Sequence, residues 1–145
     1  KLKEGNLIEN LLEDVEIWID GGHNQDAAKA IASTLKDWRA EAPEISIHII
    51  FGALNNRRPQ NFLKYFTNVV DTIRAVDIPG ETNALSTSEI ESAALECGLT
   101  AYPAKGISFA ISDIVSNSSG KRRILICGSL YLAGAVLRAN GCPQK

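Results

Sequence analysis

The segment that decides the fold is RILICGSLYLAGAV, which spans residues 123–136. Residues 124–127 are apolar on both faces of an extended chain, a pattern typical of a strand buried in a parallel sheet. Gly128 and Ser129 form a tight junction, and residues 130–140 have helical apolar spacing up to Gly141. Residues 16–25, EIWIDGGHNQ, repeat this order of strand, small residues and helix start. The two segments together predict an α/β protein.

Apolar strand patterns alternate with helical patterns along the rest of the chain. Strands are predicted over residues 16–20, 46–51, 72–78, 100–103 and 123–127, and helices over residues 25–39, 59–66, 90–97, 107–115 and 130–140. We therefore expect a three-layer α/β domain over residues 1–145. Its sheet should be mostly parallel and doubly wound (Rossmann-like), with five to six strands and helices on both faces.

The composition argues against several classes of protein. Hydrophobic residues at 45% and charged residues at 22% are globular values, so disorder and coiled coil are not expected. A net charge of −2 provides no basic excess for nucleic acid or an anionic membrane, and no apolar run approaches the ~20 residues of a membrane-spanning helix. The odd set of Cys97, Cys127 and Cys142, without C-x-x-C spacing, predicts free thiols in a reducing, cytoplasmic compartment.

The candidate binding residues follow two strands, because ligands of open parallel sheets bind at the carboxyl ends of the strands. Asp20 is suited to sugar hydroxyls or a cation, and equally to capping the next helix. His23 is either a solvated loop residue or a donor to a phosphate, and Asn24 has the default role of a turn or cap residue. Ser129 either binds a carboxylate or phosphate, or caps the last helix. These alternatives stay open on the residues alone.

Other polar and sulfur-containing residues favour structural roles. His48 lies in an apolar strand, where a hydrogen-bonded sheet histidine is expected, and Cys127 is expected to be a buried thiol of the core. Arg57 and Arg58 lie in a strand-end loop, where exposure to solvent is common, and no role is assigned to them. Neither G-x-G-x-x-G after a strand nor a P-loop is present. The residues alone therefore indicate an α/β domain with two candidate anion-binding turns.

The two turns together resemble one known family. Residues 20–25, DGGHNQ, are similar to the D-G-A-H-N-P segment that opens the C-terminal domain of folylpolyglutamate synthase and dihydrofolate synthase, which are Mur-type ATP-dependent amide ligases. Residues 128–137, GSLYLAGAVL, are similar to the G-S-L-Y-L-A-G-x-V-L segment near the end of that domain, and FGAL at residues 51–54 also matches. Gly22 and Gln25 replace the usual Ala and Pro. Asn-Asn-Arg-Arg at residues 55–58 replaces a Lys-Asp-Lys-Asp pattern.

The resemblance covers essentially the whole chain and implies an activity for a larger protein. The absence of Met, even at position 1, agrees with a C-terminal, glutamate-ligase domain whose ATPase and folate-binding domain lies elsewhere. Such a ligase uses ATP and Mg²⁺ to convert the carboxylate of dihydropteroate or a folate into an acyl phosphate, which L-glutamate attacks. The implied partners are ATP, L-glutamate, the pteroate or folate acceptor and the N-terminal domain, which holds most of the Mg²⁺ contacts. We expect a cytoplasmic monomer, inactive as this domain alone, with no metal ligand assigned to it.

The resemblance also implies roles for individual residues. Asp20 would contact the ATP ribose or help to fix the nucleotide, and His23 would lie near the γ-phosphate and the incoming glutamate. Both are catalytic candidates, and Asn24 would support the same nucleotide-binding turn. At the second motif, Ser129 with Gly128 would receive a glutamate carboxylate at the helix N-terminus. Tyr131 is assigned to the same glutamate pocket.

Two alternatives from other classes are kept open. A Mur-type amino-acid ligase of cell-wall synthesis would share the architecture, although the sequence has no Asp-Asn-Pro-Arg-like motif. A non-catalytic nucleotide-binding or receiver-like module would use Asp20 as a phosphate acceptor. A receiver needs acids at neighbouring strand ends, and the sequence places only Asp20 at such an end, with Asp77 one residue short of another.

Overall fold

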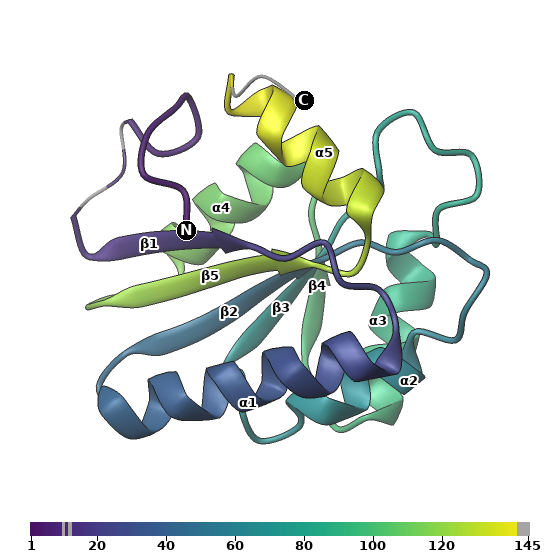
Figure 1. The fold of residues 1–145 in the computed structure, drawn as a ribbon, viewed down its shortest axis with the longest axis horizontal. Coiled ribbons are helices and arrows are strands. Elements are labelled where there is room, and N and C mark those ends of the chain that lie inside the picture. Colours follow the sequence, from purple (N-terminus) through teal and green to yellow (C-terminus); the bar gives the residue numbers. More distant parts are fainter. Residues whose placement is uncertain (10, 12, 142–145) are drawn as a thin grey trace.

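The computed structural model describes residues 1–9, 11 and 13–141 and contains a parallel five-stranded sheet (Figure 1). The strands are β1 (Val15–Ile19), β2 (Ser46–Phe51), β3 (Thr72–Ala75), β4 (Ala101–Pro103) and β5 (Arg122–Cys127). Their order across the sheet is β1-β5-β2-β3-β4, and every neighbouring pair is parallel. Cys142 and the predicted frayed tail after it lie outside the described residues.

Helices cover both faces of the sheet. They are α1 (Gln25–Glu41), α2 (Gln60–Leu63), α3 (Thr87–Glu96), α4 (Ile107–Ser116) and α5 (Leu130–Ala139), with a 3₁₀ turn over Lys64–Phe66. Figure 1 shows α1, α2 and α3 on one face and α4 with α5 on the other. This arrangement confirms the predicted three-layer α/β fold, with five strands.

Two predicted elements are shorter or more broken than expected. The helix predicted over residues 59–66 is divided into α2 and the 3₁₀ turn that follows it. The strand predicted over residues 72–78 ends at Ala75. Val76 still donates its N–H to the Phe51 carbonyl, but β2 and β4 both end at this level, so the ladder has no partner strand to continue along.

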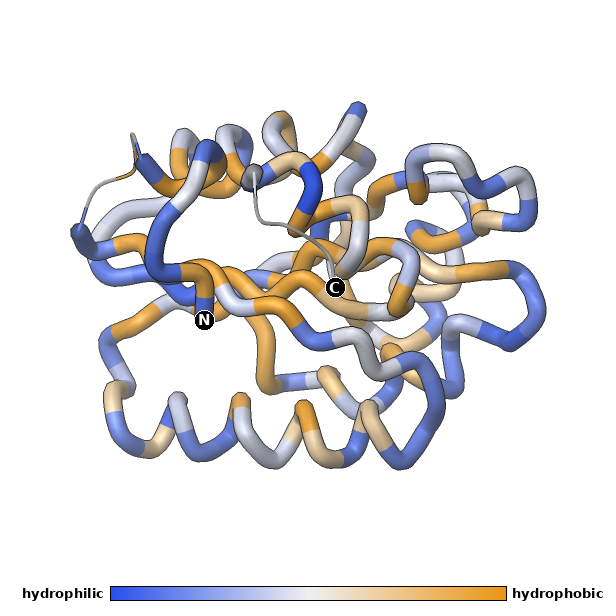
Figure 2. The backbone as a smooth tube through the Cα atoms, turned by 45° about the horizontal axis from the view of Figure 1, so that its top comes forward, coloured by the Kyte–Doolittle hydropathy of each residue, from blue (hydrophilic) through white to orange (hydrophobic). Residues whose placement is uncertain are grey.

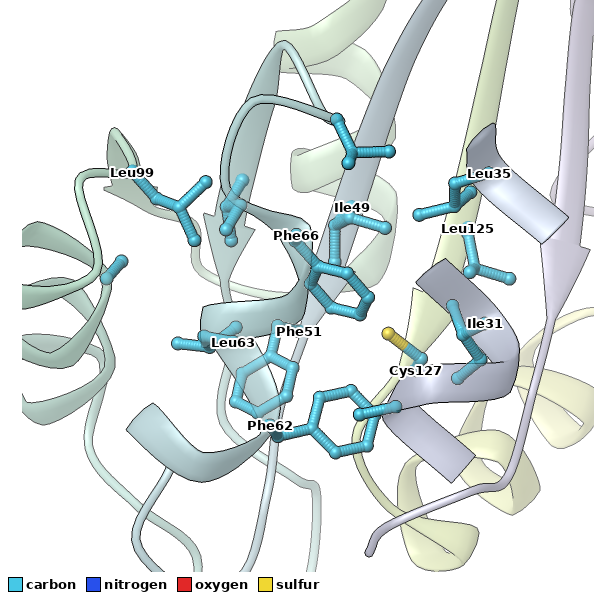
Figure 3. Close-up of a cluster of buried hydrophobic side chains, with 14 of the residues drawn as sticks. Ile31, Leu35, Ile49, Phe51, Phe62, Leu63, Phe66, Leu99, Leu125 and Cys127 are labelled. Atoms are coloured by element: carbon cyan, nitrogen blue, oxygen red, sulfur yellow. The ribbon is translucent and has the colours of Figure 1, made fainter. Parts of the chain in front are cut away.

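Each face of the sheet has its own hydrophobic core. The α1 face packs the aromatic rings of Phe51, Phe62 and Phe66 against Leu35 and Leu125 (Figure 3). The face under α4 and α5 is mainly aliphatic, with Ile124, Ile126 and Ile114 fully buried. Figure 2 shows the apolar residues along the central strands and polar residues in the outer loops. Burial on both sides explains the continuous apolar runs in β2 and β5.

The strand order brings distant loops together at one edge of the sheet. β5 lies between β1 and β2, so the segments after these three strands are neighbours. Gly52 donates its N–H to the Cys127 carbonyl at 3.3 Å, and Gly128 has a φ of 115°. A side chain on Gly128 would overlap the Gly52 carbonyl oxygen, so this close approach requires glycine.

Candidate anion-binding site

A pocket of about 440 Å³ lies beyond the carboxyl ends of β2 and β5. Three walls surround it: the start of α1, the loop after β2 with the first turns of α2, and the start of α5. Buried Phe51 and Phe62 also line it, and Figure 3 shows their rings side by side. The volume is within the range of sites for small molecules, which runs from about 300 to 1,000 Å³.

The α5 wall brings together the three residues predicted to bind glutamate. Gly128, Ser129 and Tyr131 all line the pocket. The Ser129 Oγ caps α5 by accepting a hydrogen bond from the Tyr131 N–H at 3.0 Å, and this side chain is only 3% exposed. Tyr131 is 55% exposed. The capping role that the sequence left open is therefore present, at a helix N-terminus that faces the pocket.

The α1 wall contains His23 and Asn24, which were both predicted near a nucleotide. Asn24 is the N-cap of α1, and its Oδ1 accepts a hydrogen bond from the Ala27 N–H at 2.9 Å. His23 is exposed in the loop just before this cap. Both candidates therefore lie where free N–H groups and the positive end of the helix dipole favour an anion.

Asp20 lies at the end of β1, next to β5, but outside the set of residues that line the pocket. Its Oδ1 accepts a hydrogen bond from the Gly22 N–H at 2.7 Å, so the carboxylate folds its own loop and Asn24 caps the helix. This loop lies against the start of α5. A Cβ added to Gly21 would be only 3.1 Å from Leu130 Cδ1. Asp20 thus supports the loop that presents His23.

Sequence reasoning missed the third wall. Arg57 and Arg58, with Asn56 and Asn61, line the pocket from the loop between β2 and α2. The only signal in the sequence was a pair of arginines at a strand end, and that pattern alone does not distinguish a ligand contact from a solvated loop. Pairing β2 with β5 places these arginines opposite the start of α5.

The charge of the pocket is positive. His23, Arg57 and Arg58 are among its lining residues, and none of the described residues that line it is Asp or Glu. Two helices, α1 and α5, also begin at its walls. Arginine side chains and helix N-termini both favour carboxylate and phosphate groups, so the arrangement is suited to anionic ligands.

Two further predictions concern Cys127 and His48, which do not line the pocket, and the structure confirms both. Cys127 is a buried, free thiol. Burial is the main cause that raises the pKa of this thiol, and the nearby charge of Asp20 raises it further. His48 is 3% exposed and has its Nδ1 2.6 Å from Thr72 Oγ1 and its Nε2 2.9 Å from Ser46 Oγ. Burial lowers the pKa of His48 to about 4, so its ring is a neutral, hydrogen-bonded part of the sheet.

Neither a metal-binding cluster nor a membrane-spanning helix occurs in the described part of the chain. Across residues 1–9, 11 and 13–141, no group of three or more His, Cys, Asp or Glu side chains is arranged to hold a metal ion. Over the same residues, none of the helices has the length and apolar character needed to cross a membrane.

The parallel five-stranded sheet with helices on both faces defines a doubly wound α/β domain, and its positive pocket lies at the strand ends, where such folds bind ligands. The chain belongs to the family described as dihydrofolate synthetase, C-terminal domain, whose model matches residues 6–139. The resemblance seen in the two motifs is therefore confirmed at the level of the family. No curated protein sequence matches the chain.

Solved structures share the fold. A Mycobacterium tuberculosis folylpolyglutamate synthase complexed with ADP has a TM-score of 0.74 and 24% identity over 89% of this chain. E. coli FolC in complex with DHPP and ADP has a TM-score of 0.72 and 17% identity over 88% of the chain. A bifunctional folylpolyglutamate synthase/dihydrofolate synthase from Yersinia pestis, complexed with AMPPNP and Mn ion, has a TM-score of 0.70 and 17% identity over 85%. This chain spans 30%, 29% and 28% of these structures, respectively.

Proposed function

We propose that residues 1–145 form the C-terminal domain of an ATP-dependent amide ligase that adds L-glutamate to dihydropteroate, to folates or to both. The observation that carries this proposal is the meeting of both family-like segments in one pocket, with His23 and Asn24 on one wall and Gly128, Ser129 and Tyr131 on another. Membership of the dihydrofolate synthetase family supports it.

The proposed reaction has two steps. The acceptor carboxylate takes the γ-phosphoryl group of ATP, which releases ADP and leaves an acyl phosphate. The glutamate nitrogen then forms a bond to the acyl carbon and loses a proton, and phosphate departs with the electrons of the broken C–O bond. Exclusion of water matters here, because an acyl phosphate is readily hydrolysed.

The residues of this chain would bind and orient the reactants. Ser129 and the N–H groups at the start of α5 would hold the α-carboxylate of glutamate, with Gly128 allowing close approach and Tyr131 beside it. His23 would lie between the phosphate and the incoming amine, and Asn24 would hold the turn. Asp20 would fix the loop and contact the ribose from outside the pocket.

The remaining parts of the catalytic machinery are assigned to the N-terminal domain of the longer protein. Mg²⁺ would offset phosphate charge when bound, but the described residues provide no carboxylate cluster for it, so we assign its ligands to the other domain. The greater length of the ADP-bound and AMPPNP-bound structures supports this division. We also propose a monomer that acts in the cytoplasm, and free Cys97 and Cys127 support a reducing compartment.

The test is an ADP-release assay with the full-length protein that contains these residues. We expect release that requires both L-glutamate and a pteroate or folate acceptor, and none from residues 1–145 alone. Release with a UDP-linked cell-wall precursor instead would identify the cell-wall branch. No amino-acid-dependent release with any acceptor, together with acceptor-independent phosphorylation of Asp20, would favour a receiver-like module and contradict the ligase.

A further inference from the structure

The first residue of α1 brings to the pocket a polar side chain that the helix itself does not need. Gln25 follows the N-cap Asn24 and occupies the first helical position, where a backbone N–H has no partner within the helix. Proline is favoured at this position, and the extended backbone of Asn24, with φ −110° and ψ 175°, is close to what a following proline requires. Gln25 therefore contributes mainly through its side chain, which lines the pocket.

The Gln25 side chain is held by a residue from another element. Tyr65 lies in the 3₁₀ turn over Lys64–Phe66, and its hydroxyl donates a hydrogen bond to Gln25 Oε1 at 3.2 Å. The next residue in this turn, Phe66, is fully buried, and the Tyr65 ring is partly buried against the same hydrophobic core. Tyr65 thus ties the start of α1 to a turn that the core holds in place.

Two lysines flank the Tyr65 ring. The Nζ atoms of Lys64 and Lys29 lie 5.2 Å and 5.9 Å from the ring centre, respectively, a distance at which a cation is attracted to the face of an aromatic ring. Within the part of the chain that the structure describes, neither lysine forms an ion pair with an acid. These contacts restrain the ring, so the hydroxyl stays beside Gln25.

The hydrogen bond from Tyr65 decides which part of the Gln25 amide is free. A glutamine amide has an oxygen that accepts hydrogen bonds and a nitrogen with two protons to donate. The oxygen is occupied by the Tyr65 hydroxyl, whereas among the described residues Nε2 has no acceptor. The described residues that line the pocket also include no Asp or Glu that could take these protons. The two donors are therefore available to a ligand.

We propose that Tyr65 is a positioning residue for the Gln25 amide, and that Gln25 Nε2 donates a hydrogen bond to a phosphate oxygen of ATP. This inference rests on the proposed ligase function, which assigns phosphate to the α1 wall. Gln25 lines the same wall as His23 and Asn24. A hydrogen bond to a charged oxygen is stronger than one between neutral groups, and an amide that is already oriented loses less entropy when it binds.

The first experiment is Gln25→Pro in the full-length protein. Proline at the first helical position should keep α1 intact while removing the amide. At saturating L-glutamate and acceptor, we expect the KM for ATP to rise about tenfold or more, the range for losing a hydrogen bond to a charged group. The KM for glutamate should change by less than about twofold under the same reasoning. Titration calorimetry with AMPPNP should show the same loss of affinity without turnover.

Two further variants separate positioning from structure. Tyr65→Phe removes only the hydroxyl, so the amide must be ordered on binding and the KM for ATP should rise about two- to fivefold. The double variant Q25P/Y65F should match Q25P alone, because Tyr65 acts only through Gln25. Gln25→Glu still accepts the Tyr65 hydroxyl but places a negative charge beside phosphate. It should raise the KM for ATP at least as much as Q25P, whereas a role limited to holding α1 predicts no change.

Two matched controls lie outside the pocket. Gln60 is the first residue of α2, and its Nε2 donates to Glu96 Oε2 at 2.7 Å, while Tyr102 is an exposed tyrosine of β4. Gln60→Ala and Tyr102→Phe should leave the KM values for ATP and glutamate unchanged. Thermal unfolding of Q25P and Y65F, followed by circular dichroism, should stay cooperative and within a few degrees of the parent.

Three results would overturn the inference while leaving the ligase function intact. They are an unchanged KM for ATP in Q25P, equal rises of the two KM values, and additive effects in Q25P/Y65F. If the parent protein shows no glutamate-dependent ADP release, the proposed function fails, and the AMPPNP titration then decides this inference separately. Weaker binding by Q25P would still support a phosphate contact, and equal binding by Q25P and the parent would overturn it.

Discussion

The hydroxyl of Ser129 caps α5 at the pocket wall and retains further hydrogen-bonding capacity. One lone pair of its oxygen accepts the Tyr131 N–H and caps α5. A serine hydroxyl also has a proton to donate and a second lone pair, so capping leaves its donor available to a ligand. The capping role of this residue is compatible with the proposed binding role, and the two roles can be separated by experiment.

Replacing Ser129 by Ala should affect stability and substrate binding at once. Loss of the cap should lower the free energy of unfolding by about 1 kcal/mol, measured with urea on residues 1–145. In the full-length protein, the KM for glutamate should rise more than the KM for ATP.

The matched control for Ser129→Ala is Ser86→Ala. Ser86 caps α3 through a capping box and lies outside the pocket. It should show a similar loss of stability with both KM values unchanged. Equal increases of the two KM values in Ser129→Ala would contradict its assignment to glutamate.

Gly128 should be far less replaceable than another glycine of similar backbone geometry. Gly128 and Gly120 both have positive φ, 115° and 75°, but a Cβ on Gly120 meets nothing within 4 Å. Gly120→Ala should therefore cost only the backbone strain, about 1 kcal/mol. Gly128→Ala adds the overlap with the Gly52 carbonyl and should cost about 3 kcal/mol or more, or prevent folding. Urea unfolding of the two variants measures the difference, and equal costs would mean that the close contact of the two segments is not important.

At the scale of elements, the β2–β3 pair carries a buried histidine that should make stability depend on pH. Burial lowers the pKa of His48 to about 4, the charges of Arg74 and Arg122 add to this lowering, and Asp71 opposes it. The unfolded chain, with a histidine pKa of about 6.5, takes up the proton first. The stability due to neutral His48 is therefore complete above about pH 6.5 and is lost as the pH falls toward 4.

We expect the free energy of unfolding to fall by about 1–2 kcal/mol between about pH 7 and pH 5 because of His48. Urea titrations at both values measure this slope. His48→Gln should be less stable at pH 7 but should have a flatter profile over the same range. His23→Gln, at the exposed loop histidine, should keep the parent's profile. A His48→Gln profile as steep as the parent's would show that other groups govern the acid sensitivity.

Local patterns predicted most of these elements, because each strand and helix carries its own apolar period. Two helix starts were also predictable, since Asn24 and Ser129 have the chemistry of N-caps and both act as caps. The end of β3 was not predictable in this way. Val76 and Ile78 continue the apolar alternation and are buried, but the ladder ends where the neighbouring strands end. That limit depends on tertiary contacts.

Local sequence patterns predicted two walls of the candidate site but not the third. The α1 and α5 walls follow strands with recognisable motifs, so His23 and Ser129 were found from the sequence. The Arg57–Arg58 wall joins them only because β2 pairs with β5, and these strands are far apart along the chain. No local period specifies which strands become neighbours, so the third wall required the structure.

At the scale of the whole molecule, the two hydrophobic cores share one sheet and should unfold together. Leu63 is fully buried on the α1 face, and Ile114 is buried on the face under α4. Replacing either residue by Ala should cost about 2–5 kcal/mol. Each change should shift a single unfolding transition of the whole domain. Every strand contributes side chains to at least one of the two cores, and neighbouring strands are hydrogen-bonded to each other.

The measurement for this prediction is thermal unfolding followed by far-ultraviolet and near-ultraviolet circular dichroism. The two signals should coincide in the parent and in both variants, as two-state behaviour requires. A variant in which only one signal shifts would mean that the two faces of the sheet unfold separately.

The main-chain contact at the strand ends and the loop after β2 have separate structural origins, and this separation has a consequence for engineering. Gly128 and Gly52 bring two main-chain segments into contact at the strand ends, whereas residues 55–58 lie in a loop held by the hydrogen bond from the Asn55 N–H to the Asn83 carbonyl and by the start of α2. Exchanging those four residues for the corresponding tetrapeptide of a related domain should therefore change the charge that lines the pocket without rebuilding the sheet. The charge of the pocket could then be varied independently of the stability of the fold.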